Sequence, residues 1–160
     1  MSTERMQESL QTVLTQEVQC TEHLLTCLTK ERTALAARDM PALEQTTEKK
    51  LQYTGQLEQL ENQREQLVAG LGFDSGAKGL RHCLKSLPQA KHLMQLWQQV
   101  LTNMEACRNG NLTNGAILEA GRRHVDQALL ILRGQSGAPS LYNPNGDNPA
   151  NLGQRELGKV

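Results

Sequence analysis

The chain has few aromatic residues and no long apolar run. Among its 160 residues, only Tyr53, Phe73, Trp97 and Tyr142 carry an aromatic ring. A core built mainly from Leu, Val, Ala and Met suits packed helices better than a β-sheet. No stretch approaches the roughly 18 consecutive apolar residues of a membrane-spanning helix, and no basic segment followed by an apolar run opens the sequence. We therefore expect a cytosolic all-α protein without membrane insertion.

The chain has no net charge, and its cysteines do not resemble a secreted disulfide framework. The 17 Lys and Arg residues balance 17 Asp and Glu residues, so no overall field attracts nucleic acid or an anionic membrane. The chain has four cysteines, and Cys20 and Cys27 fall seven residues apart on one predicted helix. A helical rise of about 10 Å between them is too long for a disulfide. We expect reduced thiols.

The sequence lacks the patterns of a catalytic or metal centre. Cys20, His23 and Cys27 could share one helix face, but a zinc site needs a further ligand, so we expect the two cysteines in the core. No Glu-x-x-His pair of a di-metal bundle occurs, and no phosphate-binding loop. A thiol protease would need a cysteine activated by a histidine. Cys83 adjoins His82 in the sequence, but neighbouring residues on a helix point in different directions and do not form such a pair. We expect no enzyme, no metal and no cofactor.

The most regular feature is an alternation of three- and four-residue steps from Asp39 to Leu71, which predicts a long helix over residues 40–70. Asp39 is a good N-cap, Pro41 fits a first turn, and Gly70 and Gly72 end the pattern. The track consists of Met40, Leu43, Thr47, Lys50, Thr54, Leu57, Glu61, Arg64, Val68 and Leu71, with Leu51, Tyr53, Leu60 and Leu67 beside it. Half of the track is polar, so we expect it to support the other helices rather than to pair with itself.

The other predicted helices cover residues 3–37, 77–87, 89–108 and 112–133. The first and second should form an antiparallel hairpin because their link is very short. Arg108, Asn109 and Gly110 predict a break before the last helix, and Pro88 either ends one helix or opens the next. Together these helices form an elongated antiparallel bundle over residues 1–133. Residues 134–160, rich in Gly, Pro and Asn, should form a flexible or loosely docked tail.

Two apolar features remain near the end of the chain. Leu118, Val125, Leu129 and Leu132 share one face of the last predicted helix, and residues 129–132 are apolar all round. This end is either enclosed or left bare for a partner. In the tail, Leu141 and Tyr142 lie between two prolines, where they could anchor a partner or pack back on the bundle.

Three short motifs carry a resemblance to a known family. The first is Asn-x-x-Asn-Gly-x-x-Leu-Glu over residues 111–119, the second Ala-Leu-x-x-Leu over 128–132, and the third Leu-Tyr-x-x-x-Gly over 141–146. Their order and spacing resemble the closing pattern of the flagellar export chaperone family FlgN. The resemblance implies a bacterial cytosolic chaperone that binds hook–filament junction (hook-associated) proteins. Such a chaperone prevents their premature assembly and delivers them to the flagellar type III export apparatus.

The resemblance also implies a binding site in the C-terminal region. The expected partner-binding residues are Leu118, Val125, Leu129, Leu132, Leu141 and Tyr142. Asn114 and Gly115 are expected to shape the start of the last helix, and Glu119 and Gly146 complete the motifs. The oligomeric state is open between a monomer and a weak dimer. The alternative function is a coiled-coil scaffold or adaptor without a client, in which the first two helices self-associate.

Overall fold

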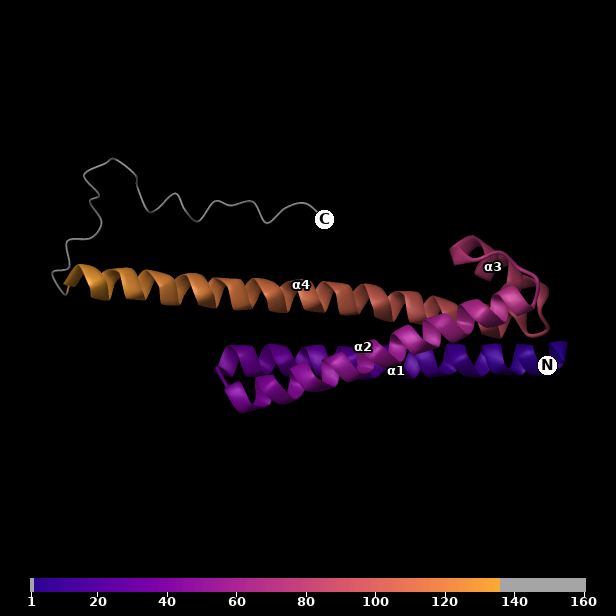
Figure 1. Cartoon of the computed structure of the whole chain (residues 1–160), viewed down its shortest axis with the longest axis horizontal. Helices are drawn as coiled ribbons and strands as arrows, with labels where there is room; N and C mark the ends of the chain where they lie inside the picture. The colour runs from indigo at the N-terminus through magenta and orange to yellow at the C-terminus, as the bar shows by residue number, and fades with distance from the viewer. Residues whose placement is uncertain (1, 136–160) are drawn as a thin grey trace, which may run out of the picture. The chain divides into compact units, whose positions relative to one another are not determined.

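The computed structural model describes residues 2–135, and these contain helices but no strand. The helices are α1 (Thr3–Ala37), α2 (Met40–Gly70), α3 (Gly76–Ser86) and α4 (Ala90–Gln135), as Figure 1 shows. The predicted all-α class is confirmed. The chain divides into two compact units inside α4, after Leu118, whereas the sequence placed the boundary after residue 133. Of the second unit, only the α4 segment that begins at Glu119 is described.

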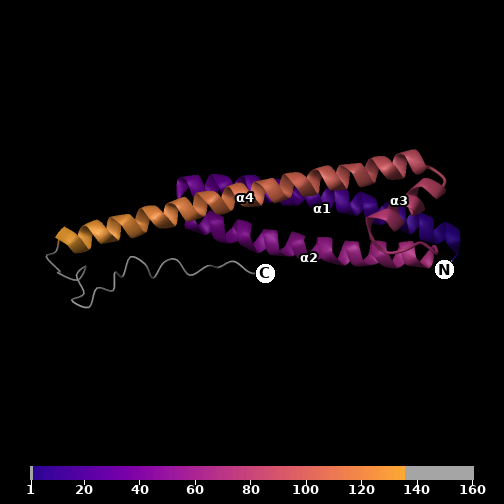
Figure 2. The same ribbon diagram turned by 90° about the horizontal axis from the view of Figure 1, so that it is seen from above.

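The first two helices form the predicted antiparallel hairpin and lie side by side in Figures 1 and 2. Arg38 ends α1 in the left-handed conformation, with φ of 54°. The next residue, Asp39, caps α2, because its side chain accepts a hydrogen bond from the backbone N–H of Ala42 at 3.1 Å. Pro41 occupies the first turn, where its missing N–H costs no helical hydrogen bond. The end of one helix and the start of the other are therefore encoded in adjacent residues.

The predicted break between residues 108 and 112 is wrong, because α4 runs without interruption from Ala90 to Gln135. The reason is that α4 packs against α1 on both sides of Gly110, where Cys107 contacts Leu24 and Leu28 and the buried Asn114 bonds to Leu28. Gly110 itself faces Leu28, and a Cβ there would lie 3.5 Å from Cδ1 of Leu28, an ordinary contact distance. A glycine inside a helix costs about 1 kcal/mol relative to alanine. Here the tertiary contact offsets that cost.

Pro88 neither ends nor begins a helix. It lies in the turn between α3, which ends at Ser86, and α4, which begins at Ala90. The preceding residue, Leu87, is extended with ψ of 153°, the conformation that a following proline favours. Gln89 completes the turn with a positive φ of 63°.

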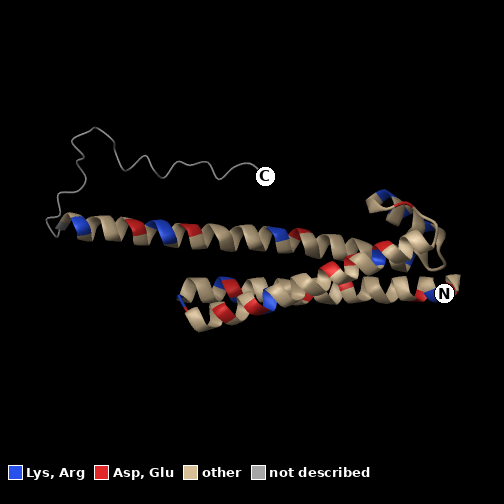
Figure 3. Cartoon of the chain, in the orientation of Figure 1, with Lys and Arg blue, Asp and Glu red and all other residues tan. Residues whose placement is uncertain are grey.

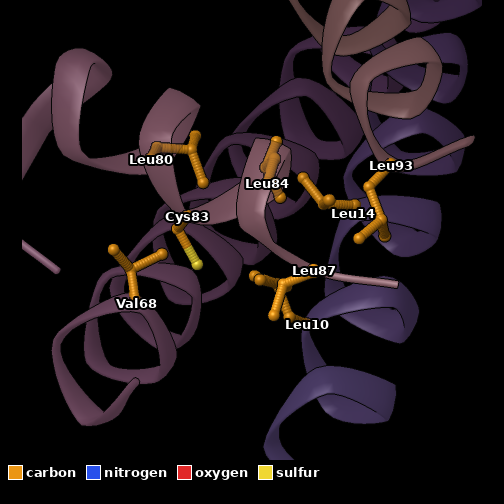
Figure 4. Packing of buried hydrophobic residues seen from close by; sticks show 8 residues of the cluster. All are labelled: Leu10, Leu14, Val68, Leu80, Cys83, Leu84, Leu87 and Leu93. Atoms are coloured by element: carbon orange, nitrogen blue, oxygen red, sulfur yellow. The ribbon is translucent and has the colours of Figure 1, made fainter. Parts of the chain in front are cut away.

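The main apolar core of the first unit joins the start of α1, the end of α2, α3 and the start of α4. Figure 4 shows its buried members, which are Leu10, Leu14, Val68, Leu80, Cys83, Leu84, Leu87 and Leu93. A second cluster lies further along α1, where Leu24 and Leu28 contact Cys107 of α4. Leu10, Leu14, Leu24 and Leu28 recur at helical spacing along α1, and all four are buried.

Candidate functional site

The last turns of α4 carry an exposed apolar face. Leu118, Val125, Leu129 and Leu132 follow one another at spacings of seven, four and three residues, so they lie on one side of the helix. Their exposed fractions are 60%, 56%, 46% and 60%. Among residues 2–135 nothing encloses this face, which agrees with the bare alternative of the two left by the sequence. Their role in binding stays a prediction, and Leu141, Tyr142 and Gly146 lie outside the described residues.

The same face of α4 is buried in the preceding turns. Val100, Cys107 and Asn114 precede Leu118 at helical intervals of seven, seven and four residues, and all three are buried. Asn114 is the last buried residue of α4 within the described range. The exposed apolar residues therefore continue the stripe that packs against the hairpin earlier in the helix. Such a stripe is suited to receive another helix.

Charged residues of both signs alternate along this part of α4 (Figure 3) and pair with one another. Arg122 contacts Glu119 at 2.8 Å and Asp126 at 3.2 Å, and Arg123 contacts Glu119 at 3.5 Å. The hydrogen bond from Arg122 lowers the pKa of the Glu119 carboxyl from its ordinary value. Glu119 of the family motif therefore forms ion pairs within its own helix. These pairs hold its carboxylate to the arginine side chains.

Asn114 does not begin a helix, contrary to the expectation from the sequence. It lies inside α4, is buried, and donates hydrogen bonds to the backbone oxygen of Leu28 at 2.9 Å and to Glu31 Oε1 at 2.8 Å. Its own oxygen accepts a hydrogen bond from Nε of Arg32 at 3.1 Å. Lys50 of α2 joins the group through Glu31, 3.4 Å away. Asn114 therefore ties α4 to the hairpin through a polar cluster.

Gly115 also has a different role from the one expected. A Cβ at Gly115 would meet no atom within 4 Å, so this glycine does not permit close packing. Gly110, five residues earlier, faces Leu28, but a Cβ there would also fit at an ordinary contact distance. The structure gives no packing reason for a glycine at position 115.

Further polar residues lie in the seam between the helices, and sequence reasoning missed them. Glu17, Thr21 and Glu31 are buried on α1. Thr21 accepts a hydrogen bond from Nδ2 of Asn103 on α4 at 3.0 Å. The signal was present in the sequence, because these α1 residues continue the three- and four-residue steps set by the buried leucines from Leu10 to Leu28.

The cysteines occupy the core positions expected of them. Sγ of Cys20 donates to the backbone oxygen of Tyr53 at 3.3 Å, and Sγ of Cys27 donates to that of Thr46 at 3.1 Å. Burial raises the pKa of both thiols. The ring centre of His23 lies 5.4 Å from that of Tyr53. Within residues 2–135, no group of three His, Cys, Asp or Glu side chains could hold a metal ion.

Both the sequence and the fold of this chain are similar to those of known proteins. The family model described as FlgN protein matches residues 6–150, which is most of the chain. The chain belongs to the FlgN family. Two curated relatives from Yersinia enterocolitica, both named Flagella synthesis protein FlgN, are 30% and 29% identical to it over 154 residues. Each alignment covers 94% of this chain and 97% of the relative.

A solved structure supports the same assignment. A crystal structure from Pseudomonas aeruginosa, described as a flagella synthesis protein FlgN, matches with a TM-score of 0.64 and 25% identity. The match covers 78% of this chain and 96% of that chain. Membership of the FlgN family supports a role in flagellum synthesis and confirms the resemblance seen in the closing motifs. Across residues 2–135, no helix is long and apolar enough to span a membrane.

Proposed function

We propose that this FlgN-family protein is a cytosolic, non-enzymatic export chaperone. It binds hook–filament junction proteins, prevents their premature assembly and delivers them to the flagellar type III export apparatus. The observation that carries the proposal is the exposed apolar face formed by Leu118, Val125, Leu129 and Leu132 on α4. A protein that assembles late exposes apolar surface until it reaches its site, and a cover for that surface keeps it soluble.

The exposed face suits an amphipathic helix. Full burial of one Leu or Val side chain contributes about 1.5–3 kcal/mol. These four side chains are already about half covered, and association itself costs about 4–15 kcal/mol, so the face alone does not set the affinity. The partner must bring its own apolar residues at helical spacing, as in other helix-in-groove complexes. The proposed chaperone needs no nucleotide hydrolysis, because the client is released when another surface competes for its apolar residues.

The tail supplies a second contact in this proposal. Leu141 and Tyr142 form the only Leu-Tyr pair after α4, and an aromatic residue with an aliphatic neighbour is a common anchor. The tail reaches the same partner or the export apparatus, while the face on α4 holds the client.

The test replaces the apolar face and leaves the bundle intact. Val125→Ser combined with Leu132→Ser should abolish capture of purified hook-associated proteins and leave the helical circular dichroism unchanged. Leu112→Ser is the matched control, because Leu112 is 67% exposed on a different side of α4. Full binding by the double variant would contradict the proposed site.

A second variant separates the chaperone from a scaffold. Removal of residues 134–160 should weaken binding of junction proteins or of the export apparatus without loss of helicity. A scaffold would instead keep its assembly state and show no client binding in either form. Binding at full strength by the truncated chain would show that the tail has no part in the site.

A further inference from the structure

Glu17 is a carboxylic acid placed in the interior of the first unit. Its exposed fraction is 0%. One carboxylate oxygen pairs with the guanidinium group of Arg64 on α2. The other oxygen, Oε2, has no hydrogen-bond partner among the described residues. A buried charged oxygen without a partner is costly, and ordinary core positions avoid it.

The partner of Glu17 also contacts α4. The guanidinium carbon of Arg64 lies 4.6 Å from the centre of the Trp97 ring, within cation–π distance. Arg64 is therefore held between a carboxylate of α1 and an indole of α4 while its own backbone belongs to α2. One side chain joins the three long helices, and it does so next to the orphan oxygen of Glu17.

The surroundings of Glu17 favour its neutral form, because the effect of burial is larger than the attraction of the nearby Arg64. On α2, Arg64 stabilises the carboxylate, whereas Glu61 repels it. On α1, the nearby titratable group is the Cys20 thiol, which is itself buried. Trp97 on α4 brings no charge. Burial is the largest effect and raises the pKa of Glu17 from 4.5 to about 7.

We propose that Glu17, Arg64 and Trp97 form a proton-operated latch in the first unit. While Glu17 is ionised, Arg64 is held between the carboxylate and the indole ring. Protonation of Glu17 removes the counter-ion of Arg64 and frees its guanidinium group from α1. The latch changes the link between α2 and α4 locally, without unfolding the bundle.

The structure offers the freed side chain a place to move. Arg64 already lines an opening of about 160 Å³, together with Trp97 and the first residues of α3. Glu65 of α2 also lines this opening, and its carboxylate attracts a guanidinium group and opposes the positive N-terminal end of α3 at Ser75 and Gly76. Movement into this opening takes the guanidinium group away from Glu17 and changes its position over Trp97.

Trp97 is the only tryptophan of the chain, so it reports directly on the latch. Fluorescence of Trp97 should change between pH 5 and pH 9 in a single transition with a midpoint near 7. Carbon-13 NMR of the Glu17 carboxyl in the unmodified protein should titrate with the same midpoint. Glu17→Gln should abolish the fluorescence transition, and Glu61→Gln should move it to lower pH.

Histidines titrate in the same range and need a control. His82→Gln and His92→Gln, on α3 and early in α4, should leave the transition in place. A Glu17 carboxyl that titrates below pH 5 would overturn the proposal, and so would a Trp97 transition that persists in Glu17→Gln. If Glu17→Gln fails to fold, the NMR titration of the unmodified protein decides alone.

Discussion

Nδ2 of Asn114 on α4 donates a hydrogen bond to the backbone oxygen of Leu28 on α1, 2.9 Å away. The same nitrogen donates to Glu31, and the side-chain oxygen accepts from Arg32. Because each polar atom of this buried amide has a partner, a shift of α4 along α1 would leave several of them unsatisfied. The polar cluster therefore fixes the register of the two helices at the last buried residue of α4.

Asn114→Ala should lower the free energy of unfolding by about 1–3 kcal/mol, because it leaves the buried Glu31 with one partner fewer. Urea denaturation followed by circular dichroism measures the change. Asn111→Ala is the matched control, since Asn111 is exposed and accepts a single hydrogen bond from Lys50. Equal losses of unfolding free energy in the two variants would show that the buried hydrogen bonds of Asn114 do not stabilise the fold more than the exposed one of Asn111.

Leu57→Ala should cost about 2–5 kcal/mol of stability, because Leu57 is 6% exposed in the α1–α2 hairpin. Leu51→Ala, at a position with 71% exposure on the same helix, should stay within about 0.5 kcal/mol of the parent chain. Thermal or chemical unfolding compares the pair. A small loss at Leu57 would mean that the hairpin tolerates the cavity by collapsing around it.

Local signals in the sequence predicted the hairpin well but not the course of α4. Asp39 and Pro41 act through neighbouring backbone atoms, so their effect can be inferred without the fold. Asn109 and Gly110 look like a helix end by the same local rules. The helix nevertheless continues, because Cys107 and Asn114 on either side of Gly110 are held by residues of α1 that lie far away in sequence.

The prediction for the track on α2 was partly right. Leu57 and Val68 are buried as expected, whereas Leu51 beside the stripe is exposed. The polar members Lys50 and Arg64 are explained by their partners on α1, which are Glu31 and Glu17. Spacing predicts which residues share a face, but it does not predict which charges on two helices meet.

The same limit applies to the candidate site. The shared face of Leu118, Val125, Leu129 and Leu132 follows from helical spacing alone. Their exposure does not, because an apolar face of this kind is usually buried. The preference of asparagine for helix ends predicts a cap at Asn114, and only the fold reveals its partners on α1.

Gly79→Ala should destabilise the protein by about 1–3 kcal/mol, because the added Cβ would lie 1.8 Å from the backbone oxygen of Asp74. The start of α3 must shift to relieve this clash. Gly115→Ala is the opposite case, since its Cβ meets no atom within 4 Å and alanine favours the helix by about 0.5–1 kcal/mol. Melting temperatures of the two variants should move in opposite directions.

Tyr142→Ala should leave thermal unfolding nearly unchanged but weaken binding of hook-associated proteins by about 1–3 kcal/mol. The expectation follows from the proposed anchor role of the tail. Calorimetric titration of the full-length variant measures the affinity, and a melting curve of the same sample checks the fold. A large drop in melting temperature would instead show that Tyr142 belongs to the fold of the bundle.

The burial of Glu17 should make stability fall as pH rises. Its pKa of about 7 in the folded chain lies above the ordinary value of 4.5, so the folded state binds more protons between these two values. The contribution of this group is therefore fully present below pH 4.5 and is lost as pH rises through about 7. At pH 8 the loss amounts to about 3 kcal/mol. Urea denaturation at pH 5, 6, 7 and 8 should show that the parent chain loses stability relative to Glu17→Gln as pH increases. Parallel curves for the two proteins would mean that Glu17 keeps an ordinary pKa despite its burial.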